Sequence, residues 1–152
     1  MEPKDYIGED FVDVAWKIMI DAMHSIDDEE GLEHSVAVAT NAAKAGHSDE
    51  VIAAALLHDV VEDTGWELED LQETIIPEPV IEAVGVLTHD PDVDYFDYID
   101  YIMTNDMAVL VKLCDLGHNL SRKGKPHKKP KYRKAMSILN GYRRREISHA
   151  QG

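Results

Sequence analysis

Residues 51–64 read Val-Ile-Ala-Ala-Ala-Leu-Leu-His-Asp-Val-Val-Glu-Asp-Thr, an apolar run with a polar end. The run is apolar on every side of a helix, which is typical of a helix buried in the core. On such a helix His58 and Glu62 lie one turn apart, and the same spacing brings Asp59 next to Asp63. Burying these groups beside a core is costly unless a positive group pairs with them. A divalent cation is one such group, since histidine nitrogen and aspartate oxygen are ordinary metal ligands.

Taken alone, this segment also fits a helix end that is simply hydrated. A second apolar stretch, 106–121, weakens that interpretation because it repeats the pattern. Its Lys112, Asp115 and Asn119 fall on one stripe of a helix, and this stripe needs a polar partner. His34 is a third case, next to a run of small apolar residues. A lone histidine on such a face more often forms hydrogen bonds in a core, but beside two further polar clusters we interpret His34 as a ligand.

The donor types indicate what kind of metal site this is. Two histidines and two aspartates leave coordination positions free for water and substrate, as a catalytic site requires. A structural zinc site is usually closed by cysteines. The chain has one cysteine, Cys114, which we expect to be a small core residue.

Apolar residues recur at helical spacing along most of the chain, and the alternation typical of strands is scarce. The pattern predicts helices over 9–24, 32–45, 49–62, 67–73, 78–87, 95–103, 106–121 and 132–147. Residues 27–31 are expected to form a turn, and Gly46 to end the second helix. Residues 123–131 hold two prolines and a glycine and are expected to form a loop. We therefore predict an all-α fold, a single compact helical bundle over residues 1–152.

Length and composition bound the class of protein. The chain has 152 residues, of which 44% are hydrophobic, enough for one domain with a sizeable core. No intrachain disulfide can form, which favours a reducing compartment. Residues 1–8 contain no apolar signal core, and the apolar stretches are too short to span a bilayer. We expect a soluble, cytoplasmic protein with no membrane partner.

Charge is distributed unevenly along the chain. The net charge is −15, which argues against nucleic-acid binding. Residues 1–111 contain 28 acidic and three basic residues, whereas residues 112–152 contain 12 basic and two acidic ones. The basic quarter is either a hydrated surface that offsets the acidic body or a patch that receives an anionic ligand. Charge alone does not choose between these interpretations.

At this point the residues resemble a known family, the HD-domain phosphohydrolases. The motifs that carry the resemblance are His34, His58-Asp59-x-x-Glu62-Asp63-Thr64 and Lys112-Leu-x-Asp115-x-x-His118-Asn119. Within the family they are most similar to the hydrolase domain of RelA/SpoT-type proteins, above all to the small alarmone hydrolases. The resemblance covers roughly residues 34–120. It implies an all-helical HD domain that uses one manganese ion to remove the 3′-pyrophosphate from guanosine tetra- or pentaphosphate.

Carried over position by position, the resemblance also implies roles for single residues. The metal ligands would be His34, His58, Asp59 and Asp115. Glu62 and Asp63 would be the catalytic acids that orient and deprotonate the attacking water. Asn119 would contact the nucleotide, and Lys112 would support the site or a phosphate. His118 is expected to pack or to form a hydrogen bond, and His89 to lie in a loop.

The sequence departs from the family pattern just before His34. Residues 26–35 read Ile-Asp-Asp-Glu-Glu-Gly-Leu-Glu-His-Ser, without the arginine that helps to hold guanine in the family. Either the basic segment 122–134 folds across the site and compensates, or the substrate is another nucleotide. Two alternatives therefore stay open: an HD-domain nucleotidase or pyrophosphatase acting on a different nucleotide, and a catalytically silent nucleotide sensor. Retention of Glu62 and Asp63 argues against the sensor. The oligomeric state is open.

Overall fold

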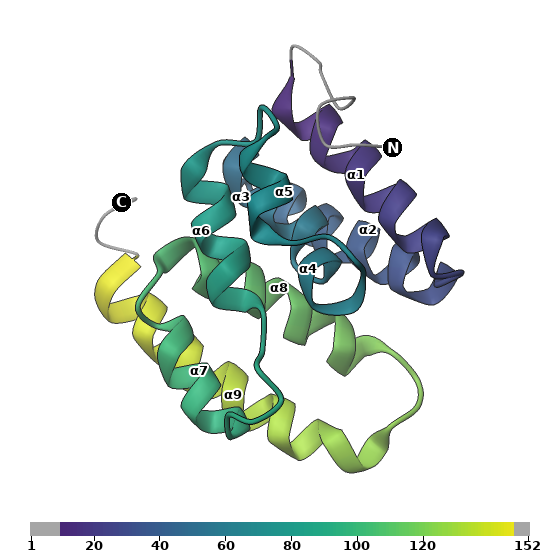
Figure 1. The fold of residues 1–152 in the computed structure, drawn as a ribbon. Helices are drawn as coiled ribbons and strands as arrows, with labels where there is room; N and C mark the ends of the chain where they lie inside the picture. Colours follow the sequence, from purple (N-terminus) through teal and green to yellow (C-terminus); the bar gives the residue numbers. More distant parts are fainter. Residues whose placement is uncertain (1–9, 148–152) are drawn as a thin grey trace.

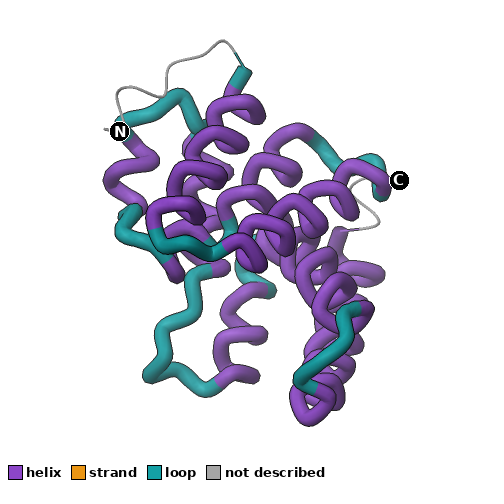
Figure 2. The backbone as a smooth tube through the Cα atoms, turned by 90° about the vertical axis from the view of Figure 1, so that its right-hand side faces the viewer, coloured by secondary structure: helices purple, strands orange, loops and turns teal. Residues whose placement is uncertain are grey.

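Helices and short connections make up the whole of residues 10–147, the part of the chain that this computed structural model describes (Figure 2). In chain order the elements are α1 (Phe11–Ser25), α2 (Glu29–Lys44), α3 (Asp49–Leu57), α4 (Val60–Asp63), α5 (Leu68–Gln72), α6 (Glu78–Leu87), α7 (Tyr95–Ile102), α8 (Asp106–Ser121), the 3-10 turn η2 (Pro126–Lys128), α9 (Lys129–Tyr142) and the π-helical turn η3 (Arg143–Ile147). No strand occurs in these residues, which confirms the prediction of an all-α fold. None of their helices has the length and apolar character needed to cross a membrane.

Side-chain caps fix where several helices begin. Asp10, Asp28, Ser48, Asp94 and Asn105 each accept a hydrogen bond from a backbone N–H in the first turn of the helix that follows. The first N–H groups of a helix have no partner within the helix, and a cap supplies one. The predicted cap at Ser48 is confirmed.

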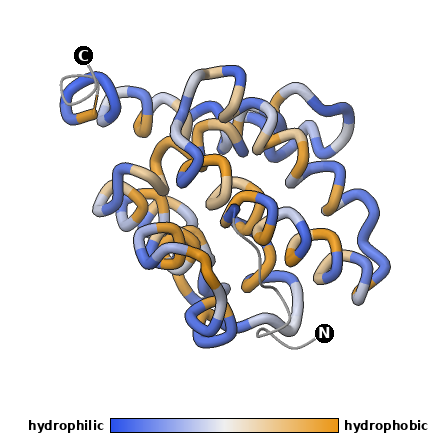
Figure 3. Tube along the Cα trace, turned by 90° about the horizontal axis from the view of Figure 1, so that it is seen from above, coloured by the Kyte–Doolittle hydropathy of each residue, from blue (hydrophilic) through white to orange (hydrophobic). Residues whose placement is uncertain are grey.

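Helix α3 forms the centre of the molecule, packed against α1, α2, α6 and α8 (Figure 1). Residues 53–57 of α3 are buried, and the three alanines among them let neighbouring helices approach closely. Apolar residues gather towards the interior of the bundle (Figure 3). Helices α7 and α9 contact each other and α8. Because α2 and α8 both pack on α3 and on each other, polar groups on these three helices come together.

The predicted helix over 49–62 is wrong at one point, because the chain forms a turn at His58 and Asp59. His58 Nδ1 lies 2.6 Å from the carbonyl oxygen of Ala55. A continuous helix would use that carbonyl to accept the N–H of Asp59. The side-chain bond of His58 uses this same carbonyl at the break, and the helix resumes at Val60 as α4. His58 and Asp59 therefore lie at a break between two helices.

Several other predicted boundaries also differ from the structure; among them, the predicted helix over 132–147 ends as α9 at Tyr142 and continues as the turn η3. The predicted turn over 27–31 is wrong beyond Asp28, because the Asp28 carboxylate accepts the N–H of Gly31 at 2.8 Å and starts α2 at Glu29. The predicted loop over 123–131 ends early, because α9 begins at Lys129 with Pro130 in its first turn. Proline is tolerated there, since that N–H has no partner within the helix in any case.

Candidate metal centre

Three buried donors from three helices converge on one point. His34 on α2, His58 at the end of α3 and Asp115 on α8 place one ligand atom each within 4.8 Å of one another. Asp115 Oδ1 is 2.7 Å from His34 Nε2 and 3.7 Å from His58 Nε2. Asp59 completes the edge of the cluster, with Oδ2 at 3.2 Å from His58 Nε2 and 3.9 Å from His34 Nε2. The structure thus brings together all four residues expected to be ligands.

The hydrogen bonds of the two Nδ1 atoms orient both histidine rings so that their Nε2 atoms point into the cluster, where a cation would lie. His58 Nδ1 carries the proton that it donates to Ala55, so Nε2 holds the lone pair in the neutral ring. His58 Nε2 is buried and makes no hydrogen bond of acceptable geometry. A buried polar atom without a partner is rare and costly. An imidazole nitrogen and a carboxylate oxygen 2.7 Å apart, as in His34 and Asp115, need a proton or a cation between them.

The charges of the side chains in the cluster also indicate that it holds a proton or a cation. Burial opposes charge on His58, but the carboxylates of Asp59 and Asp115 outweigh it and hold the His58 pKa well above its usual range. Burial likewise opposes the charge of Asp115, while Lys112 and the two histidines hold the Asp115 pKa well below its usual range. A metal-free cluster therefore keeps a proton where a cation fits. The donor set suits a divalent metal ion.

Lys112 and Asn119 both support the carboxylate of Asp115. Lys112 Nζ donates to Asp115 Oδ2 at 2.8 Å, and Asn119 Nδ2 donates to Asp115 Oδ1 at 3.2 Å. Ligating carboxylates commonly receive such hydrogen bonds, which orient them. Both side chains also reach the cavity beside the cluster, so support of the ligand and contact with a substrate are compatible.

The predicted catalytic pair Glu62 and Asp63 lies at the end of α4. Glu62 lines the cavity, and its Oε1 accepts the backbone N–H of His89 at 2.6 Å. Both side chains are largely exposed, but Asp63 does not line the cavity. Partial burial, with the charges of Asp59 and Glu62, raises the pKa of Asp63 to about 6. Of the two carboxylates, Glu62 is the better placed to act on a molecule in the cavity.

The cavity has a volume of about 300 Å³ and combines acidic, basic and aromatic walls. Its lining residues are His58, Asp59, Glu62, Leu87, His89, Tyr95, Tyr98, Lys112, Asn119, Lys128, Lys131 and Tyr132. Lys128 and Lys131 come from the basic segment 122–134, which therefore does reach the metal site. His89 lies in a loop, as predicted, but its ring stacks on Tyr98 with centroids 4.3 Å apart.

Two residues that line the cavity, Tyr95 and Leu87, could not be identified from the sequence. Tyr95 lines the cavity, and its hydroxyl is buried. Leu87 lines the cavity as well. Its backbone carbonyl accepts a hydrogen bond from the Tyr98 hydroxyl at 2.5 Å. The aromatic spacing on α7 gives no indication of which rings face a cavity, because that depends on how α7 packs against α6 and α8.

These features describe an all-α arrangement of residues 10–147 with a buried histidine and aspartate cluster that is a candidate site for a divalent cation. Residues 12–85 match the HD domain family. The guanosine-3′,5′-bis(diphosphate) 3′-pyrophosphohydrolase of Haemophilus influenzae is 34% identical over 122 residues, which cover 73% of this chain and 18% of that enzyme. The chain therefore contains a segment, residues 12–85, that is similar to the HD domain family, and it spans a minor part of the length of this relative.

A solved structure has the same fold. It belongs to a metazoan ortholog of SpoT that hydrolyses ppGpp and plays a role in starvation responses. The two chains superpose with a TM-score of 0.65 at 20% sequence identity, over 93% of this chain and 97% of that chain. At this identity the likeness supports the all-α HD-domain fold.

Proposed function

We propose that this protein is a metal-dependent phosphohydrolase that removes the 3′-pyrophosphate from guanosine tetraphosphate or a closely related nucleotide. The observation that carries the proposal is the buried donor cluster facing a cavity with both a carboxylate, Glu62, and several lysines. The Haemophilus influenzae relative with this activity supports the choice of substrate. The basic wall favours an anionic ligand over a neutral one.

The proposed ligands of the metal are His34, His58, Asp59 and Asp115. A bound divalent ion, which we expect to be manganese, would lower the pKa of a water molecule and offset phosphoryl charge. The protein residues have to hold the water, bind the phosphates and accept a proton. A mixed nitrogen and oxygen donor set suits manganese as well as other divalent ions.

Glu62 is proposed to accept the proton of the attacking water. Its Oε1 accepts the N–H of His89, which holds the carboxylate at the wall of the cavity. Asp63 is proposed to assist Glu62, either by orienting the water or by passing the proton from Glu62 to the solvent. Its pKa near 6 lets it exchange a proton close to neutral pH.

Lysines and Asn119 are proposed to bind the substrate. Lys128 and Lys131 reach the cavity from the start of α9 and are placed to bind phosphoryl oxygens. Lys112 is already paired with Asp115, so its main role is to hold that ligand. Asn119 borders the cavity and is proposed to contact the nucleotide. The single cysteine supports a reducing compartment, and we propose the cytoplasm. We also propose that residues 1–152 form one domain.

A different nucleotide is the second candidate substrate. Glu30 lies close to Arg122, in the segment where the family carries its guanine-binding arginine. A carboxylate in place of that arginine would favour hydrogen-bond donors of a substrate and disfavour its anionic groups. A silent sensor remains less favoured, because it has no use for a carboxylate held beside the metal site.

The test is a screen of the pure, manganese-loaded protein that measures orthophosphate and pyrophosphate separately. We expect pyrophosphate from guanosine tetraphosphate. Replacing Glu62→Gln removes the proton acceptor at nearly constant size and should lower kcat by about 10²- to 10⁴-fold with manganese binding retained. Glu69→Gln on α5 is the matched control and should retain wild-type activity. Orthophosphate release from nucleoside monophosphates, with guanosine tetraphosphate untouched, would favour the second substrate class.

A further inference from the structure

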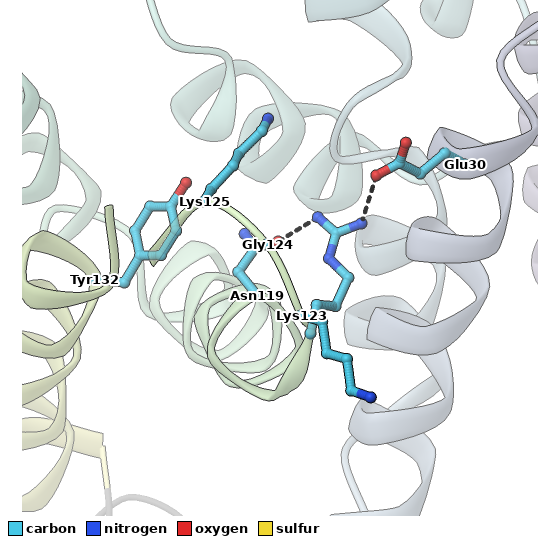
Figure 4. Close-up of a pocket in the computed structure, with 7 residues that line it drawn as sticks. Glu30, Asn119, Lys123, Gly124, Lys125 and Tyr132 are labelled. Carbon is cyan, nitrogen blue, oxygen red and sulfur yellow. Dashed lines mark hydrogen bonds and ion pairs between the residues drawn. The ribbon is translucent and has the colours of Figure 1, made fainter. Parts of the chain in front are cut away.

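Two further concave regions lie outside the metal cavity. The first is a cavity of about 210 Å³ that shares Asn119 and Tyr132 with the metal cavity and therefore belongs to the site already described (Figure 4). The second is a groove of about 450 Å³ between α5, α6 and the residues that join α7 to α8. No residue that lines this groove also lines the metal cavity. The groove is therefore a separate surface with no part in the proposed reaction.

This surface, which we call the acidic groove, combines apolar and acidic side chains. Leu68, Ile81 and Val86 give it an apolar lining. Glu78 and Glu82 are exposed along it, one turn apart on α6, where like charges repel each other. Glu78 lies in the first turn, where the helix dipole offsets its charge, but Glu82 lies beyond that turn. Neither carboxylate forms an ion pair within the described part of the chain, so a cation from outside would relieve their repulsion.

The acidic groove also exposes an aromatic ring. Tyr101 lines it from the end of α7, and 55% of this residue is accessible to solvent. Tyrosine and arginine are enriched where proteins contact one another, because each combines a flat apolar surface with hydrogen-bonding groups. An apolar lining with an exposed tyrosine and two unpaired glutamates therefore fits a basic segment of a protein.

A basic turn adjoins the same end of α8. Asn105 lines the acidic groove, and the next residue, Asp106, accepts the hydroxyl of Tyr142 at 2.7 Å. Tyr142 ends α9, and η3, which follows it and contacts α8, exposes Arg144 and Arg145. Within residues 10–147 neither arginine takes part in an ion pair. The π-helical form of η3 is itself uncommon, and such turns are frequent at functional sites.

We propose that the acidic groove binds η3 of a second copy of this chain, with Arg144 of one copy facing Glu82 of the other. A two-fold axis forms this contact twice, because each copy carries both the groove and the turn. The distribution of charge favours this occupant, since 28 of the 30 acidic residues lie in residues 1–111 and 12 of the 15 basic residues in 112–152. Salt screens the long-range repulsion between two chains of net charge −15 more than it screens close pairs. The inference does not depend on the proposed function.

The experiment is sedimentation velocity of the full chain between about 1 and 200 μM at about 0.15 M salt. We expect the mean mass to rise from 17.1 kDa towards twice that value, with a dissociation constant in the micromolar range that is typical of small polar interfaces. Glu82→Arg and Arg144→Glu should each weaken the dimer about tenfold, because each reversal places like charges at both symmetric contacts. An equimolar mixture of the two variants should regain the wild-type dissociation constant within about threefold, since both contacts of the mixed dimer again pair opposite charges.

Glu33→Arg on α2, exposed and outside the groove, is the matched control. It changes the net charge by the same amount as Glu82→Arg and should leave the dissociation constant unchanged. Thermal melting followed by circular dichroism shows that each variant is folded, and mixing cannot restore a variant that fails to fold. A chain that stays monomeric at every concentration, a Glu82→Arg dimer of wild-type strength, or a mixture no stronger than its components would each overturn the inference.

Discussion

Among single side chains, His118 has a specific role to test, because its Nδ1 lies 2.7 Å from Nδ1 of His34. One ring must donate to the other. His34 Nε2 faces Asp115 and needs its lone pair for a cation, so the His34 proton belongs on Nδ1 and His118 accepts it. Burial, together with the charges of His34 and Arg122, lowers the pKa of His118 and keeps its ring neutral.

We therefore expect His118→Phe to weaken manganese binding about 10- to 100-fold, the usual effect of losing a group that orients a ligand. His118→Asn, whose amide oxygen can still accept the His34 proton, should retain most of the affinity. Calorimetric titration of metal into the protein measures both. His47→Phe, at a partly exposed histidine outside both cavities, is the control. Wild-type affinity in His118→Phe would show that His34 needs no such partner.

Residue chemistry also explains how much of the site the sequence predicts. His58, Asp59 and Asp115 could be predicted because polar side chains are rare on helices that are otherwise apolar. The hydrogen bond expected of His118 is present, but its partner could not be predicted, since a histidine next to Asn119 in sequence gives no indication that it contacts His34, which is 84 positions away. Lys128 and Lys131 line the metal cavity from the end of η2 and the first turn of α9, and each of these elements has a proline at its start.

Among the helices, the end of α2 offers a test that involves no side-chain contact. Gly46 has a φ of 80°, and a Cβ at this position would meet nothing within 4 Å. The N–H groups of Gly46 and His47 bond to the carbonyls of Ala43 and Ala42, the pattern of a Schellman cap. Any penalty for a larger residue here is therefore conformational.

Gly46→Ala should lower the free energy of unfolding by about 1 kcal/mol and the melting temperature by about 2–4 °C. Gly65→Ala is the matched control, because its Cβ also meets nothing within 4 Å and its φ lies outside the left-handed region. That variant should be neutral or slightly stabilising, since alanine restricts the unfolded chain. Equal melting temperatures for the two variants would contradict the assignment of a left-handed cap at Gly46.

The helices show which structural features can be predicted from sequence periodicity. The predictions for α6 and α8 match the structure at both ends, because a proline or a cap begins each helix where its apolar pattern begins. The break at His58 could not be predicted in this way, because it arises from one side chain competing for a backbone carbonyl. This break places Asp59 beside His58 Nε2, so a local departure from regularity positions two of the proposed ligands.

At the scale of the whole molecule, two opposing charge effects act on an anionic substrate. The net charge of −15 repels it, whereas Lys112, Lys128 and Lys131 around the metal cavity attract it. Salt screens charges that lie more than about 10 Å apart at about 0.1 M, and short-range pairs much less. If the distant acidic body dominated, added salt would speed the encounter. If the basic cavity wall dominates, added salt slows it.

We expect the cavity wall to dominate, because its lysines line the cavity that the phosphates would enter, whereas Asp59 and Glu62 are the acidic residues among its lining. The kcat/KM for guanosine tetraphosphate should therefore fall as sodium chloride rises from about 0.05 M to about 0.5 M at constant manganese. Lys131→Gln should lower kcat/KM at low salt and flatten this dependence. Lys17→Gln on α1, outside both cavities, should leave the slope unchanged. A kcat/KM that rises with salt would mean that the acidic body governs approach of the substrate.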